Sequence, residues 1–144
     1  MLKVKIAETQ MEKEQAFEVR RKVFVEEQQV PIHIEMDEHD DSAIHFIAYQ
    51  LEQPVAAGRM REVEIGLGKI ERVCVLSEYR GLHLGMMVMN EMEAYAHTHG
   101  IFRLKLNAQT HALPFYEKLG YEIASEEFME ADIPHQTMEK SVTD

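Results

Sequence analysis

The middle of the chain carries the feature that most constrains its fold, which is a strand, a glycine-containing loop and a helix in direct succession. Residues 69–76 (KIERVCVL) are rich in the β-branched residues typical of a strand. The loop SEYRGLHLG follows, and the helical segment after it ends at Gly100. Its apolar residues recur at the spacing of a buried helix face: Leu84, Val88, Met92 and Tyr95. This unit predicts a sheet with a helix packed on it.

The segments on either side extend this unit into a mixed α/β sheet. Before it, the sequence predicts a strand at 2–7, a helix at 11–29 that Pro31 ends, and a hairpin of strands at 44–50 and 55–61. After it come a strand at 101–108, a short helix at 111–120 and two strands within YEIASEEFME and HQTMEK. Strand 44–50 is apolar on both faces, which favours a central place in the sheet. We therefore expect helices on both faces of the sheet.

Length and composition exclude several classes of protein. The 144 residues contain no repeat or linker, so we expect a single domain over 1–144. One cysteine, no signal-like start and no long apolar run predict a cytoplasmic protein without a membrane segment. A net charge of −11 argues against nucleic acid as a partner. That charge is compatible with an amine ligand, although it equally fits a general role in solubility.

The loop after residue 76 has the chemistry of an anion-binding site. Backbone N–H groups at the start of a helix point outward, and the helix dipole adds partial positive charge there. Such a loop suits a pyrophosphate. Arg80 can add a charge-assisted hydrogen bond, while Gly81 and Gly85 allow the backbone to approach a ligand closely.

Four segments resemble the GCN5-related N-acetyltransferase (GNAT) family. The loop Arg80–Gly85 resembles the family's Arg/Gln-x-x-Gly-x-Gly/Ala loop, except that His83 replaces the usual glycine. HALPFYEKLGYEI resembles the second family motif, in which an Asn often precedes; this chain has Gln109 there. The segments RRKVFVEEQQVPIHIEMDEHDDSAIH and EEFMEADIPHQTMEK are similar to an ElaA- and YjcF-like bacterial subgroup. The resemblance implies an acyl-CoA N-acyltransferase fold with a central, mostly antiparallel sheet.

The resemblance also implies a reaction and a set of site residues. The reaction is transfer of an acetyl group from acetyl-coenzyme A to an amine by direct attack. Tyr116 is expected as general acid and Glu71 as general base. Coenzyme A is expected to contact the strand before the loop, the loop and Gln109: Val73, Cys74, Val75, Arg80, Gly81, Leu82, His83, Leu84, Gly85 and Gln109. The acceptor is left open between a polyamine-like metabolite, an aminoglycoside-like compound and a protein amine, and a homodimer is left open too.

Several residues also have a second interpretation. Arg80 could form a salt bridge instead of binding phosphate, and Cys74 fits a small buried thiol better than the nucleophile of a cysteine hydrolase. At His83 we expect helix-like, negative φ; a positive φ would favour a degenerate fold that binds coenzyme A or a partner without catalysis.

The acidic and histidine-rich stretch 33–42 is predicted to be a surface loop. It lacks the spacing of zinc and EF-hand sites, so no metal is expected. The carboxylates of Glu26, Glu27 and Asp37 are candidates for recognition of the acceptor.

Overall fold

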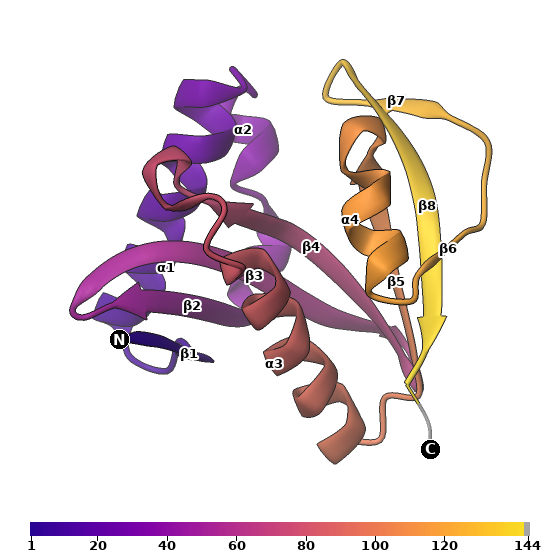
Figure 1. The fold of residues 1–144 in the computed structure, drawn as a ribbon, viewed down its shortest axis with the longest axis horizontal. Helices are drawn as coiled ribbons and strands as arrows, with labels where there is room; N and C mark the ends of the chain where they lie inside the picture. The colour runs from indigo at the N-terminus through magenta and orange to yellow at the C-terminus, as the bar shows by residue number, and fades with distance from the viewer. Residues whose placement is uncertain (143–144) are drawn as a thin grey trace.

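The computed structural model describes residues 1–142, which build an eight-stranded sheet in the order β1-β2-β3-β4-β5-β8-β6, with β7 also paired to β8 (Figure 1). The strands are β1 Leu2–Ile6, β2 Ile44–Gln50, β3 Gln53–Glu64, β4 Leu67–Val75, β5 Arg103–Gln109, β6 Glu122–Ile123, β7 Phe128–Glu130 and β8 Ile133–Ser141. Among the strand pairs described, only β4 and β5 run parallel. The expected mostly antiparallel sheet is confirmed.

The helices lie between the strands along the chain. They are α1 Gln10–Arg20, the π-helical segment η1 Arg21–Glu27, α2 Ile32–Glu35, α3 Leu84–Thr98 and α4 Leu113–Lys118. Short 3₁₀ turns are η2 Glu38–Asp41, η3 Ser77–Tyr79 and η4 Thr110–Ala112. The capping box of Thr9 and Glu12 starts α1 by satisfying the free N–H groups of its first turn. The predicted helix 11–29 thus widens into a π-helix after Arg20, a distortion common near functional sites.

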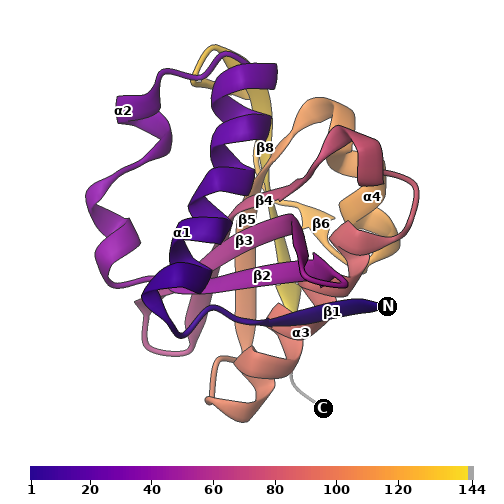
Figure 2. The same cartoon turned by 90° about the vertical axis from the view of Figure 1, so that its left-hand side faces the viewer.

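Helices cover both faces of the sheet, as expected (Figure 2). One face carries the larger apolar core, in which α3 packs Val88, Met89 and Met92 against strand residues such as Phe46 and Ile70. The opposite face carries a smaller cluster, in which Ala16 and Val19 of α1 meet Ile47, Ala57 and Cys74 of the sheet. Strand β2 is internal and buried on both faces, although the middle of the sheet is β4.

Strand β4 contains a bulge that separates it from β5. Its pairing with β3 shifts by one residue, so that Arg72 and Val73 together lie opposite Gly58. Arg72 adopts a left-handed φ of 61° there. Pairing with β5 covers only Leu67–Ile70, and Figure 1 shows the two strands moving apart beyond that point. A bulge increases local twist, which accounts for the separation.

Gly58 lies opposite the bulge and close to α3. A Cβ atom at this position would lie 2.6 Å from the methyl carbon of Met92 on α3. The Met92 side chain would have to move to accept a larger residue here, and Val88, at 3.3 Å, leaves little further space.

Candidate active site

The separation of β4 and β5 opens a cavity of about 940 Å³ between η1, the loop before α3, and α4. It has the size of a small-molecule site. Most residues expected to bind coenzyme A or to catalyse line it: Glu71, Val73, Cys74, Val75, Arg80, Gly81, His83, Leu84, Gly85, Gln109 and Tyr116. Leu82 is exposed and does not line the cavity. Of the acidic acceptor candidates, Glu27 and Asp37 line it and Glu26 does not.

His83 differs from its expected conformation. Its φ of 63° and ψ of 21° are left-handed, so the helix-like geometry predicted for this residue is wrong. Gly81, two residues earlier, also has a positive φ of 88°. Two left-handed residues redirect the chain from η3 into α3. A histidine in this conformation carries strain of about 1–2 kcal/mol.

The start of α3 is free for a ligand. His83 is the N-cap residue and its side chain forms no capping hydrogen bond. The amides of Leu84 and Gly85 therefore lie at the cavity without a side-chain cap. A Cβ added at Gly81 would meet no atom within 4 Å, so the loop is open on that side. Uncapped amides at a helix N-terminus suit an anion.

Arg80 is engaged in an ion pair. Its two terminal nitrogens donate to the two Glu27 oxygens at 2.7 Å each, and its Nε donates to the Val75 carbonyl at 3.0 Å. The hydrogen bond from Arg80 lowers the pKa of Glu27. This is the salt bridge that the sequence left open as the alternative to phosphate binding. Contact of Arg80 with a phosphate, for which two N–H donors remain, stays a prediction.

Tyr116 and Cys74 both lie in apolar surroundings at the cavity. The Tyr116 ring packs edge-on against Phe115 and Tyr121, with ring centroids 4.9 and 6.1 Å away. Burial raises the pKa of Tyr116, so its hydroxyl stays protonated at neutral pH. Burial likewise raises the pKa of Cys74 to about 12, which disfavours a nucleophilic thiolate. The buried-thiol interpretation of Cys74 therefore fits better.

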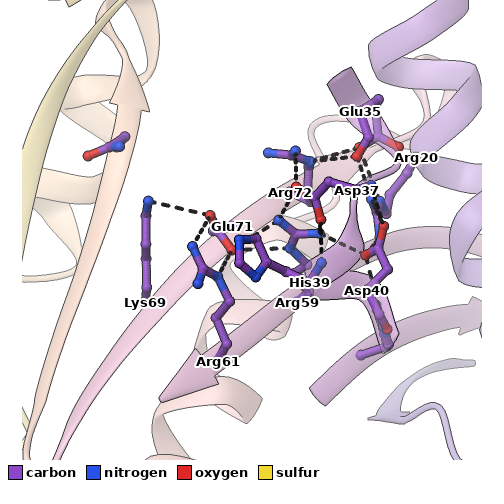
Figure 3. Close-up of polar contacts among 12 residues, drawn as sticks. Arg20, Glu35, Asp37, His39, Asp40, Arg59, Arg61, Lys69, Glu71 and Arg72 are labelled. Carbon is purple, nitrogen blue, oxygen red and sulfur yellow. Dashed lines mark hydrogen bonds and ion pairs between the residues drawn. The ribbon is translucent and has the colours of Figure 1, made fainter. Parts of the chain in front are cut away.

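Glu71 lies among three cations (Figure 3). It accepts hydrogen bonds from Arg59 at 3.1 Å and Arg61 at 2.7 Å, and it forms an ion pair with Lys69 at 3.4 Å. Burial alone would raise the pKa of Glu71, but these partners hold it at about 2. A carboxylate so stabilised is a weak base, which weighs against the expected role of Glu71 in deprotonating the acceptor.

A buried ion network lies behind Glu71. Arg20 donates to Glu35 at 3.1 Å and to Asp40 at 2.6 and 3.1 Å, and Arg59 donates to Asp40 at 2.8 Å. Burial would raise the pKa of Asp40, but hydrogen bonds from the two arginines hold it well below its ordinary value. Glu35 is 1% and Asp40 is 9% exposed, so the surface-loop prediction for 33–42 is wrong at these two residues.

The network also holds the β4 bulge. Arg72 donates to the carbonyls of Ile34 and Glu35 at 3.2 Å each and to Asp37 at 3.2 Å. These contacts explain how a non-glycine residue keeps a left-handed backbone there. Sequence reasoning missed the arginines. The available signal was two arginines in the otherwise apolar strand VAAGRMR, because a charge in a buried strand requires a partner.

Two glutamines connect opposite walls of the cavity. The amide of Gln109 on β5 donates to Gln28, next to η1, at 2.9 Å, and Gln28 donates back at 3.4 Å. His111 lies 2.6 Å from the same Gln109 oxygen. Gln109 is thus positioned at the cavity as the second family motif predicts, while its contact with a ligand stays a prediction.

The described residues contain neither a cluster of metal-ligating side chains nor a membrane-spanning helix. Within residues 1–142, no group of three or more His, Cys, Asp or Glu side chains is arranged to hold a metal ion. Over the same residues, no helix has both the length and the apolarity needed to cross a membrane.

Known proteins share both the sequence and the fold. The acetyltransferase (GNAT) domain model matches residues 7–142. The uncharacterized N-acetyltransferase YjcF of Bacillus subtilis is 44% identical over 140 residues, covering 96% of this chain and 99% of YjcF. The crystal structure of Escherichia coli ElaA superposes with a TM-score of 0.87 at 24% identity, covering 97% of this chain and 99% of ElaA.

A solved structure with a bound ligand has the same fold. An aminoglycoside 6′-N-acetyltransferase complexed with coenzyme A superposes with a TM-score of 0.76 at 17% identity, covering 100% of this chain and 98% of that one. The domain match and the acetyltransferase relatives thus define an acyltransferase. The chain belongs to the GNAT family of acetyltransferases and is similar in sequence to YjcF and in fold to ElaA.

Proposed function

We propose that this protein transfers an acetyl group from acetyl-coenzyme A to an amine by direct attack. The observation that carries the proposal is the cavity at the divergence of β4 and β5, with the uncapped start of α3 at one end and Tyr116 on its wall. The aminoglycoside acetyltransferase of the same fold, which is complexed with coenzyme A, supports acetyl-coenzyme A as the acyl donor.

The residues present fit this donor. The amides of the loop and of the first turn of α3 would bind the pyrophosphate, and Arg80 would join them through its remaining N–H groups or in exchange for Glu27. The edge of β4 from Glu71 to Val75 faces no β5 partner, so its polar backbone groups would contact the pantetheine and polarise the thioester carbonyl.

Proton transfer completes the mechanism. The amine must lose a proton to attack, since an alkylamine has a pKa of about 10. Attack forms a bond between the amine nitrogen and the acyl carbon and breaks the bond between that carbon and sulfur. Tyr116, whose hydroxyl stays protonated, would donate to the departing thiolate. The role of Glu71 as the base remains a prediction. Its low pKa is compatible with a mechanism in which a water in the cavity accepts the proton of the amine instead.

A degenerate protein that binds coenzyme A without catalysis is the second candidate. The left-handed His83, at the position of the family's usual glycine, favours it, because the strained residue borders the loop expected to bind pyrophosphate. We also propose a single domain, which the continuous sheet from Leu2 to Ser141 supports, and a cytoplasmic location.

Two measurements test the proposal. Acetyl-coenzyme A should raise the melting temperature, since a ligand that binds only the folded state stabilises it. Free thiol should then be released when a panel of amines is added. Binding without thiol release would favour the degenerate protein, whereas the lack of any binding at millimolar donor would contradict the loop assignment.

A further inference from the structure

Three cations lie side by side across three strands. The residue pairs in register are Arg61 with Lys69 between β3 and β4, and Lys69 with Lys105 between β4 and β5. Their neighbours Met60, Ile70, Leu104 and Leu106 are buried in the α3 core. Because side chains alternate along a strand, the three cations point to the opposite face. We call Arg61, Lys69 and Lys105 the cationic row.

Repulsion within the cationic row lowers the stability of the fold unless anionic groups neutralise its charge. Like charges directly opposite on neighbouring strands repel each other. Glu71 is the carboxylate that Arg61 and Lys69 contact, and it is already bonded to Arg59. Lys105 forms no hydrogen bond or ion pair through its side chain with any residue of the described part of the chain. Glu139 of β8 lies opposite Lys105 in register, so the positive charge without a full partner is that of Arg61 and Lys69, which share Glu71 with Arg59.

Two of the three residues of the row lie at the end of the cavity away from the α3 loop, and Lys105 does not line the cavity. Arg61 and Lys69 line the cavity, with 23% and 20% of their side chains exposed. Arg61 uses Nε and one terminal nitrogen on Glu71, and Lys69 has a single contact of 3.4 Å. An arginine has five N–H donors and a lysine three, so both keep donors for a ligand. A chain with a net charge of −11 thus presents positive charge at this place.

Resting on the proposed function, we propose that the acceptor is an amine with an anionic group, carboxylate or phosphate, which binds to the cationic row. Guanidinium and ammonium groups at one place match the oxygens of such a group. Lys69 lies four residues before Val73, where the thioester is expected, which corresponds to roughly 13 Å along β4. The long side chains of the row shorten the distance that the ligand must span. The amine and the anion must therefore be separated by a chain of several carbons. Polyamines, which carry positive charge at both ends, fit this end of the cavity poorly.

Four probes of one length test the charge preference. They are hexylamine, 6-aminohexanoate, 6-aminohexyl phosphate and 1,6-diaminohexane, each titrated calorimetrically into the protein saturated with coenzyme A. We expect one or both anionic probes to bind at least about tenfold tighter than hexylamine, and the diamine to bind weakest. The two anionic arms tell a carboxylate from a phosphate preference. Equal affinities, tighter diamine binding, or no binding of any probe at 10 mM would overturn the proposal.

Variants then assign the preference to the row. Lys69→Gln should reduce the anionic preference about tenfold and leave hexylamine affinity nearly unchanged. Lys3→Gln, which removes an exposed lysine from β1 at the far edge of the sheet, should change neither. An unaltered preference in Lys69→Gln would contradict the assignment. Thiol release from acetyl-coenzyme A, measured separately with the same probes, tests the acetyltransferase function independently of this binding result.

Discussion

The two ends of the cavity differ in the groups that form them. The end at α3 presents backbone amides and glycines, with Arg80 as its cation and a strained His83 in the loop. The end at the cationic row consists of side-chain charges, which rest on a network of buried arginines and carboxylates. Backbone groups can bind the same ligand whatever side chains surround them. Substitutions at the side-chain end can therefore change which acceptor is bound, while the backbone end would still bind the same proposed donor.

The largest expected effect lies between the two ends, at Tyr116. Tyr116→Phe keeps the ring and removes the proton donor. We expect turnover to fall by roughly 10²- to 10⁴-fold with donor affinity nearly intact. Thiol release under saturating donor measures this effect.

Tyr95→Phe is the matched control, because Tyr95 lies on α3 and does not line the cavity. An unchanged rate for Tyr116→Phe, with chemistry shown to limit turnover, would remove Tyr116 from the mechanism.

The side-chain end should be the part whose loss destabilises the fold. Arg59 is fully buried and contacts Asp37, Asp40 and Glu71. Arg59→Leu leaves these carboxylates without that partner and should lower the free energy of unfolding by about 3–5 kcal/mol in urea titrations. Arg103→Leu removes a half-exposed arginine whose ion pair is 3.9 Å long, and should cost less than about 1 kcal/mol. Similar losses of unfolding free energy in both variants would contradict a larger contribution of the buried network to stability.

Acid should weaken the side-chain end. The folded-state pKa of Glu71 is about 2 against an ordinary 4.5, so its stabilisation is complete above pH 4.5 and disappears as the pH falls toward 2. The shift corresponds to roughly 3 kcal/mol. Unfolding titrations of the native protein and Glu71→Gln should differ by about this amount at pH 7 and converge near pH 2. Parallel curves would contradict the role of the three cations.

A smaller effect is expected at the backbone end. His83→Gly replaces a strained residue by one that adopts φ of 63° freely, so stability should rise by about 1 kcal/mol. Leu51→Gly, at an exposed turn with φ of 56°, should stabilise similarly without changing donor affinity. Donor affinity should change less than about tenfold in His83→Gly. A hundredfold gain would show that the native loop is impaired and would favour the degenerate protein.

The smallest effect concerns Glu27, which forms an ion pair with Arg80 and would compete with the proposed donor for it. Glu27→Gln weakens an exposed ion pair, so acetyl-coenzyme A should bind about threefold tighter. Calorimetry measures the change. Glu26→Gln is the control, because Glu26 pairs with Arg21 instead and lies outside the cavity lining. Weaker binding in Glu27→Gln would mean that the salt bridge holds Arg80 in its binding position.

Sequence patterns located one end of the cavity and missed the other. The strand–loop–helix unit and the Phe115-Tyr116 pair are local in the chain, so the sheet, the α3 loop and Tyr116 could be placed from periodicity and family resemblance. The network joins Arg20, Asp40 and Arg59, which are distant in sequence, and no local pattern pairs them. The left-handed conformation of His83 could not be predicted for a related reason, because the sign of its φ depends on the path that η3 and α3 impose on the loop.

The side chain of Arg72 has a consequence for how such a protein can change over generations. Its backbone forms the bulge beside the cavity, while its guanidinium donates to the carbonyls of Ile34 and Glu35. Under the proposed function, a substitution at this residue would alter donor binding and acceptor binding together. Evolution of a new acceptor preference should therefore start with substitutions of Arg61 or Lys69, which leave the bulge intact. Arg72 should be among the last residues to vary.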